Sequence, residues 1–145
     1  MGPDILSYVP TNIVPKDLMR QSGITLSVLD GLVAFTVPSD NVVVLGDVKS
    51  GTVLGTLAIP AAKGVLLLSH DSLLVSTSGT VKRFALKWTA GKPTLGAGTV
   101  VISGFEDPRT LQTDPKHSRL YVADWGKSNQ IKVYDPKTYK RLLVI

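Results

Sequence analysis

Three apolar runs, each leading into a polar loop, recur along this chain at a spacing that limits the folds open to it. The runs begin at Leu32, Leu73 and Leu120, so successive starts lie 41 (73 − 32) and 47 (120 − 73) residues apart. In the third unit, 120–124 is a strand pattern, 125–130 is rich in turn-forming residues, and an apolar run resumes at Ile131. A repeat in the forties is the length of a unit of four short strands.

Strand patterns before and after each run complete a four-strand unit. The expected strands span 24–29, 32–37, 42–45 and 53–59 in the first unit, 65–69, 73–77, 81–86 and 99–102 in the second, and 110–113, 120–124, 131–134 and 140–145 in the third. Glycine and proline clusters separate them, because glycine supplies positive φ and proline cannot donate a ladder hydrogen bond. Residues 87–97 give the second unit a longer connection between its third and fourth strands.

These units predict an all-β chain made of three four-stranded antiparallel blades of an incomplete β-propeller. The expected organisation is an N-terminal segment at 1–22, followed by blades at 23–60, 61–104 and 105–145. A β-sandwich or a small barrel also has many short strands, and the nearly regular internal period favours the propeller over both. No helical period of 3.6 residues competes over a long window.

Three blades are fewer than the roughly four to eight with which propellers close. An open stack exposes apolar faces at its ends, which invites association. Three outcomes fit: two copies form a ring, a longer parent chain holds the missing blades, or the sequence is a truncated product. Residues 5–14 fit the outer strand of another blade, and a short helix is expected near Pro15 to Met19.

The composition is that of a globular chain, with 145 residues of which 43% are hydrophobic and 19% charged. The lack of cysteine excludes disulfides and thiolate metal sites and leaves the compartment undetermined. No signal-peptide pattern or apolar run of membrane-spanning length occurs, so a soluble chain is expected. The net charge of +5 fits simple solubility better than an anionic partner, because basic and acidic residues are interspersed.

Parts of the third unit resemble known propeller repeats. The segments are Pro108-Arg-Thr-Leu, Leu120-Tyr-Val-Ala-Asp-Trp-Gly and Asn129-Gln-Ile-Lys-Val-Tyr-Asp. They resemble an NHL repeat and, equally, the YVTN-type repeat of surface-layer propellers. The first unit fits the YVTN-type pattern from Asn41 to Ile59, and the second unit is the poorest match. The Asp124-Trp125 pair is not the WD-repeat motif, because it follows the second strand of its unit rather than closing the third.

In propellers of this resemblance, ligands bind near the central axis, on the face formed by the second-to-third-strand loops and the connections between blades. The resemblance therefore implies a binding face that contains Asp40, Asn41, Lys63, Glu106, Asp107, Arg109, Trp125, Lys127 and Asn129. An exposed tryptophan suits such a face, because the indole buries much area and keeps one hydrogen-bond donor. The alternative is that Trp125 packs between neighbouring blades.

Other candidate chemistry has simpler explanations. Asp40, Glu106, Asp107 and Asp124 are oxygen ligands available to a hard cation, but their spacing matches no known loop motif and turns are rich in such residues. His70 and His117 fall in turns on the opposite face. The third unit is locally basic, with Lys116, Arg119, Lys137, Lys140 and Arg141. RNA binding is therefore an alternative, but few aromatic residues interleave with these side chains, and a solvated surface explains them.

The sequence therefore predicts a non-catalytic interaction module that binds a protein or polymer partner and forms homo-oligomers or joins complementing blades. No catalytic residue, metal or cofactor is expected, because no nucleophile–base pair can be assembled without cysteine or a histidine on the predicted face. The first alternative is a fragment of a propeller enzyme, lactonase-like or lyase-like, with a metal at the axis. The second is RNA binding through the basic last blade.

Overall fold

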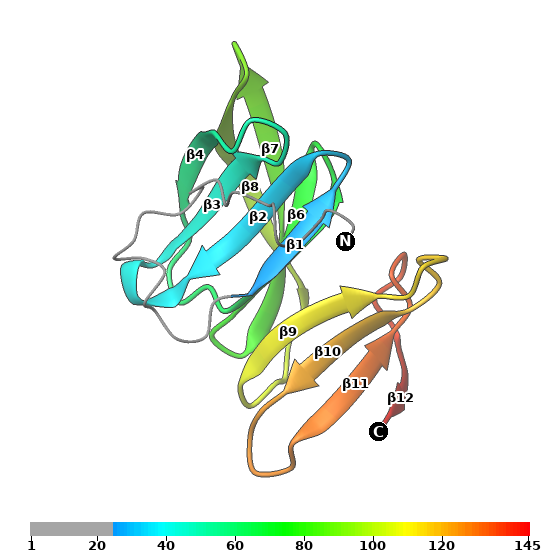
Figure 1. Cartoon of the computed structure of the whole chain (residues 1–145). Coiled ribbons are helices and arrows are strands. Elements are labelled where there is room, and N and C mark those ends of the chain that lie inside the picture. Colours follow the sequence, from blue (N-terminus) through cyan, green and yellow to red (C-terminus); the bar gives the residue numbers. More distant parts are fainter. Residues whose placement is uncertain (1–24) are drawn as a thin grey trace, which may run out of the picture.

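The computed structural model describes residues 25–145, which form three antiparallel sheets of four strands each (Figure 1). The first sheet contains β1 (Leu26–Leu29), β2 (Leu32–Val37), β3 (Val42–Asp47) and β4 (Val53–Ala58). The second contains β5 (Gly64–Ser69), β6 (Ser72–Thr77), β7 (Thr80–Thr89) and β8 (Lys92–Ile102). The third contains β9 (Pro108–Thr113), β10 (Leu120–Asp124), β11 (Gln130–Tyr134) and β12 (Arg141–Val144). Within each sheet, strands that are consecutive in sequence are also neighbours in space.

This arrangement confirms the predicted fold class, which was an all-β chain of three four-stranded blades of an incomplete propeller. Within residues 25–145 the only helical element is the short 3-10 helix η2 (Pro38–Asp40). No helix in that part of the chain has the length and apolar character needed to cross a membrane. The strand expected at 5–14 and the helix expected near Pro15 to Met19 lie outside the described residues.

Two hairpins close with two-residue turns in which both residues have positive φ. Asp30 and Gly31 join β1 to β2 with φ of 46° and 80°, and Ala90 and Gly91 join β7 to β8 with φ of 52° and 76°. Positive φ at both positions is the type I′ geometry, whose twist matches the right-handed twist of the flanking strands. These turns fix the register of the two hairpins.

The second sheet corrects the prediction of a long connection across 87–97. β7 and β8 continue almost to the tip of their hairpin, and a two-residue turn joins them. The prediction was wrong because Pro93 and Gly98 normally end strands. Here β8 is the outer strand of its sheet, where proline is tolerated, and a Cβ on Gly98 would lie 2.4 Å from the ring of Phe84. The glycine is therefore a packing requirement rather than a strand break.

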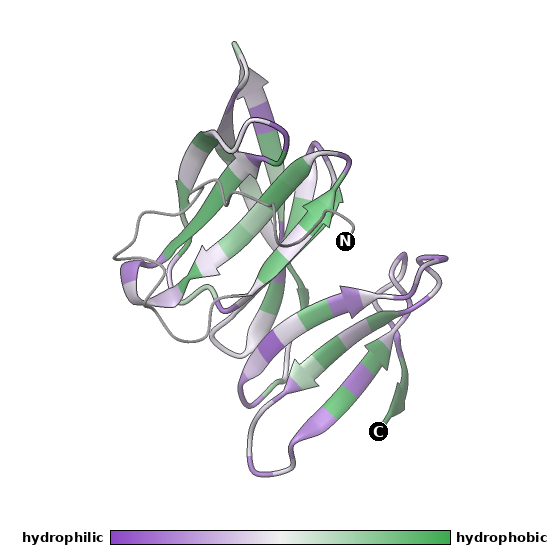
Figure 2. Ribbon diagram, in the orientation of Figure 1, coloured by the Kyte–Doolittle hydropathy of each residue, from purple (hydrophilic) through white to green (hydrophobic). Residues whose placement is uncertain are grey.

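The second sheet lies between the other two and shares a hydrophobic cluster with each. Leu45 and Leu57 of the first sheet pack in one cluster with Leu73 and Val75 of the second. A separate cluster joins the second and third sheets through β9, which contacts β5 and β6, and includes Leu74, Val81, Phe105, Leu111 and Val122. Figure 2 shows hydrophobic stretches along the strands, interrupted on β9 and β11 by hydrophilic residues, and mostly hydrophilic connecting loops in the third sheet. Burial of these strand residues is the main source of stability.

The two seams between sheets carry equivalent hydrogen bonds. Thr36 in β2 and Ser76 in β6 both lie four positions after the first residue of their strand, and both are fully buried. Thr36 Oγ1 donates to the carbonyl oxygen of Lys63 at 2.7 Å, and Ser76 Oγ donates to that of Arg109 at 2.6 Å. The second seam needs Gly64, because a Cβ there would lie 1.8 Å from the Arg109 carbonyl oxygen. The seams therefore fix the backbone from which the Lys63 and Arg109 side chains extend.

Candidate binding face

Loops that follow the second strand of each sheet, together with the connections that enter the next sheet, form one continuous face. We call this the loop face; its loops are 38–41, 78–79 and 125–129, and its connections are 59–63 and 103–107. The hydrogen bonds that tie loops to connections include Ala61 N to Asn41 Oδ1 (2.9 Å), Phe105 N to Gly79 O (3.2 Å) and Trp125 N to Asp107 O (2.9 Å). Because backbone groups make most of these bonds, the loops are held in place by the fold itself.

Side chains from the loop face and from the start of β9 meet in what we call the cation–indole cluster, which consists of Lys63, Asp107, Arg109 and Trp125. Lys63 Nζ lies 2.5 Å from Asp107 Oδ1, and Arg109 donates from Nε (3.1 Å) and Nη2 (2.9 Å) to Asp107 Oδ2. The Arg109 guanidinium also lies over the Trp125 ring, with Cζ 4.8 Å from its centroid. Such stacking is a cation–π contact, which orders both side chains.

The carboxyl group of Asp107 stays ionised because of its two cationic partners. Partial burial raises its pKa, but the hydrogen bonds and charges of Lys63 and Arg109 outweigh that effect, and the pKa is lowered overall. Two cations on one carboxylate leave the cluster with a net charge of about +1. All three charged side chains remain partly exposed, so the cluster presents positive charge to solvent.

Asp124 supports the cluster from inside the third sheet. Its side chain is fully buried, and it accepts hydrogen bonds from Glu106 N and Asp107 N and from Lys132 Nζ at 2.9 Å. Burial raises the pKa of Asp124, yet these donors more than compensate and lower it overall. Asp124 occupies the position that corresponds to Thr36 and Ser76, four residues into its strand. At this position the third sheet has a carboxylate, which only accepts hydrogen bonds, in place of a hydroxyl, which can also donate one.

Glu106 holds the β10–β11 loop in shape. Its carboxylate accepts hydrogen bonds from Lys127 N (3.1 Å) and Ser128 Oγ (3.2 Å). The loop passes so close to this side chain that a Cβ on Gly126 would lie 2.4 Å from the Glu106 Cβ. The tryptophan at the start of the loop is consequently presented on an ordered backbone.

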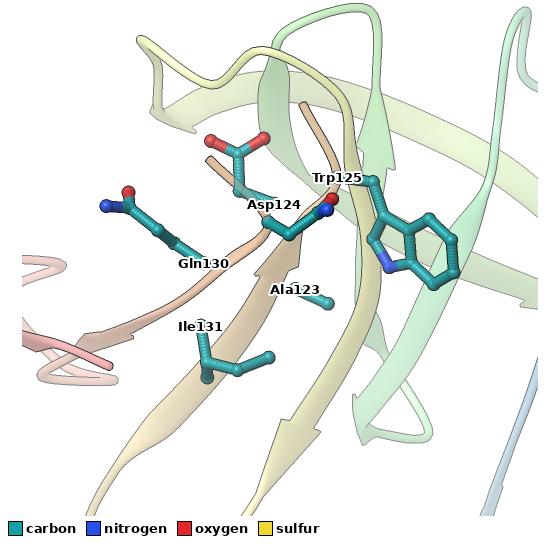
Figure 3. A pocket seen from close by; sticks show the side chains of 6 residues that line it. Ala123, Asp124, Trp125, Gln130 and Ile131 are labelled. Atoms are coloured by element: carbon teal, nitrogen blue, oxygen red, sulfur yellow. The ribbon is translucent and has the colours of Figure 1, made fainter. Parts of the chain in front are cut away.

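A hollow of about 340 Å³ lies beside Trp125 on the third sheet (Figure 3). Ala123 and Ile131 are paired across β10 and β11, and their side chains lie on the same side of the sheet as the hollow. The side chains of Asp124 and Gln130 point to the other side. Trp125 is 55% exposed and Ile131 is 37% exposed, so the hollow is open to solvent and mainly apolar.

The structure brings some of the predicted site residues together and separates others. Lys63, Asp107, Arg109 and Trp125 form one cluster, Glu106 and Lys127 adjoin it through the loop, and Asn129 lines the hollow. Asp40 and Asn41 belong to the first loop instead. Asn41 bonds to Ala61, and the hydrogen bond found for Asp40 within residues 25–145 is from Ser39 Oγ at 3.5 Å. Lys132 was missed, although the alternation of strand residues places it on the same face as Asp124.

The two histidines each make a contact away from the loop face. Trp88 Nε1 donates to the carbonyl oxygen of His70 at 2.7 Å, and the His117 ring contacts Thr113 Oγ1 at 3.1 Å. The four carboxylates considered as cation ligands do not converge, since Asp107 and Asp124 bind cationic side chains and Glu106 caps a loop. Within residues 25–145 no group of three or more histidine, aspartate or glutamate side chains is arranged to hold a metal.

Comparison with known proteins supports the fold alone. No protein-family model matches the sequence, and no curated protein matches it. The structure is similar to Kuenenia stuttgartiensis hydrazine synthase, with a TM-score of 0.61 and 17% identity over 82% of this chain and 34% of that chain. It is also similar to a structure of a nidogen/laminin complex, with a TM-score of 0.61 and 19% identity over 81% of this chain and 45% of that one.

Both similar structures have propeller-type folds, in agreement with the blades seen here. This chain spans less than half the length of either one. The resemblance to NHL or YVTN-type repeats stays a prediction, because no family match tests it.

Proposed function

We propose that this chain is a non-catalytic propeller module that binds a protein or polymer partner through its loop face. The observation that supports this proposal is Trp125, which is 55% exposed although it lies on a loop held by Glu106 and by the backbone of Asp107. An ordered, exposed tryptophan under an arginine loses little conformational entropy on binding, and both residue types are enriched among interface hot spots. One similar structure was solved as a protein–protein complex, nidogen with laminin.

Binding is favoured over catalysis because the charged groups of the loop face are already engaged with each other. Asp107 and Asp124 are held by cations, and Glu106 stabilises a turn, so none of these three carboxylates is poised as a base or as a shared metal ligand. RNA binding through the basic residues of the third blade has no comparable support. Within residues 25–145, the hydrogen bond and the cation–π contact of Trp125 are with Asp107 and Arg109, and not with any of those basic residues.

The module is also proposed to associate with copies of itself or with complementing blades. Large apolar side chains are exposed on the two end sheets, including Leu26 and Val28 on β1 and Leu142 to Val144 on β12. Within residues 25–145, Val100 is the only exposed large apolar side chain of the second sheet, which lies in the middle. An excess at the ends is what unpaired blade faces produce.

Affinity enrichment from a lysate of the source organism, with Trp125→Ala as the comparison, tests the binding proposal. We expect a partner retained by the wild-type chain to bind the variant about 2 kcal/mol more weakly, the scale of a hot spot, while thermal unfolding changes little. Val48→Ala is the matched control, because Val48 is 47% exposed at the opposite end of the first sheet. If Trp125→Ala instead lost several kcal/mol of stability, the indole would be part of the core and the proposal would fail.

A further inference from the structure

The cation–indole cluster and the hollow share the side chain of Trp125. The Arg109 guanidinium lies over the ring, and the ring also borders the hollow together with Ala123 and Ile131. A group in the hollow therefore touches apolar surface and lies close to a guanidinium. The loop face offers two adjoining subsites of different chemistry rather than one uniform patch.

The cationic subsite, formed by Lys63 and Arg109, has hydrogen-bond donors that Asp107 does not use. Arg109 uses Nε and Nη2 on Asp107, and its third guanidinium nitrogen, Nη1, has no hydrogen-bond partner among residues 25–145. Lys63 Nζ bonds to a single carboxylate oxygen there, although an ammonium group has three donors. Both side chains are partly exposed, at 38% and 43%. A second carboxylate can join this cluster without displacing Asp107.

The apolar subsite has the size and lining for one bulky side chain. Its volume of about 340 Å³ is small, and the apolar part of its lining is a methyl group, a branched aliphatic chain and an indole, beside the polar residues Asp124, Asn129 and Gln130. Filling it removes apolar surface of Trp125 and Ile131 from water, at roughly 25 cal/mol per Å². Asn129 also lines the hollow and supplies an amide for a peptide group.

We propose that the loop face recognises a peptide segment in which an aspartate or glutamate neighbours a bulky apolar residue. The acidic side chain binds Lys63 and Arg109, and the apolar side chain occupies the hollow beside Trp125. Nucleic acid fits less well, because Asp107 and Glu106 lie among the cations and a single exposed indole is a poor stacking platform. This inference rests on the proposed function and adds the chemistry of the partner.

Selection of a phage-displayed library of random linear peptides on the full chain tests the inference. The expected result is enrichment of sequences that pair an acidic residue with leucine, isoleucine, phenylalanine or tryptophan. Synthetic versions of the enriched peptides should bind at least about tenfold more weakly to Trp125→Ala and to Arg109→Gln. Lys49→Gln, in the exposed β3–β4 turn, is the matched control and should leave binding unchanged.

The outcomes separate this inference from the proposed function. Enriched peptides that depend on Trp125 but lack acidic residues would overturn the inferred chemistry and leave the binding function intact. Failure to enrich any peptide that depends on Trp125 would overturn the inference, and the lysate experiment would then decide the function independently. Retention of an oligouridine probe that competes with the selected peptides and is lost in Trp125→Ala would replace the peptide with RNA.

Discussion

Asp124 is the residue on which the geometry of the loop face depends most directly. It is buried, pairs with Lys132, and holds the backbone of Glu106 and Asp107. Asp124→Asn removes the charge and leaves Lys132 without its partner, so we expect a loss of about 3 kcal/mol in the free energy of unfolding. Urea denaturation measures this loss. Asp47→Asn, at the end of β3, is the control and should cost clearly less; equal losses would contradict the assigned role.

The same carboxyl group predicts how stability depends on pH. The pKa values of Asp124 and Asp107 are lowered in the folded state. A lowered pKa contributes stability above the unfolded-state value of about 3.9, and this contribution is lost as the pH falls through the folded-state pKa. Thermal unfolding between neutral pH and pH 3 should therefore show a falling melting temperature. The slope should be shallower in Asp124→Asn, and parallel curves would contradict the prediction.

At this scale the sequence indicated which loops carry the site but not how the side chains pair. Trp125 and Arg109 could be proposed because they lie in a loop and at the start of a strand that propellers bring to one face. The bond between Lys132 and Asp124 was missed because a lysine in a half-buried strand is usually solvated. The alternation of β10 and β11 places both residues on one face, so the pair was available from the predicted hairpin.

Among the structural elements, the seams between sheets should be where substitutions lower the free energy of unfolding most. Ser76 Oγ accepts a hydrogen bond from Gly64 N and donates one to the Arg109 carbonyl oxygen. Ser76→Ala leaves both buried backbone groups without this partner, and we expect a loss of about 2 kcal/mol in the free energy of unfolding. Ser50→Ala, in an exposed turn, should change stability much less. A neutral Ser76→Ala would mean that the seam is not held by this bond.

Gly64 gives a second, steric test of the same seam. A Cβ there would lie 1.8 Å from the Arg109 carbonyl oxygen, so Gly64→Ala should force β5 away from β9 and cost about 3 kcal/mol. Gly91→Ala is the control, because it carries a conformational cost without a steric one. Its φ is +76°, and nothing lies within 4 Å of the position that a Cβ would take. That control should cost about 1 kcal/mol in equilibrium unfolding. Equal costs would show that the close approach does not exist.

The strand bounds were predicted well where the hydrophobic pattern and the turn residues agreed, and poorly where packing between sheets decided the structure. The expected spans 32–37 and 120–124 match β2 and β10, because the apolar runs there are bounded by clear turns. β8 was predicted as 99–102 although it begins at Lys92. Its proline and glycines fit against neighbouring strands: a Cβ on Gly55 of β4 would lie 2.8 Å from Pro93. Contacts between sheets of this kind are not visible in a single sequence.

For the whole molecule, the exposed apolar residues of the end sheets predict association. Sedimentation equilibrium should give a mass that rises with concentration, because among residues 25–145 each end sheet has one neighbouring sheet where the second sheet has two. Leu143→Glu on β12 should weaken this association, whereas Val100→Glu on the middle sheet should not. A monomer over a wide concentration range would argue against open blade faces.

Hydrogen exchange of the full chain, with and without its captured partner, tests the proposed binding function most directly. We predict that binding slows exchange at 103–109 and 124–130, where the cation–indole cluster and the hollow lie. Exchange at the opposite ends of the sheets, in the turns around Ser50, Ala90 and Lys137, should be unchanged. Protection confined to those turns or to β12, with the loop face exchanging as in the free chain, would contradict binding through Trp125 and its neighbours.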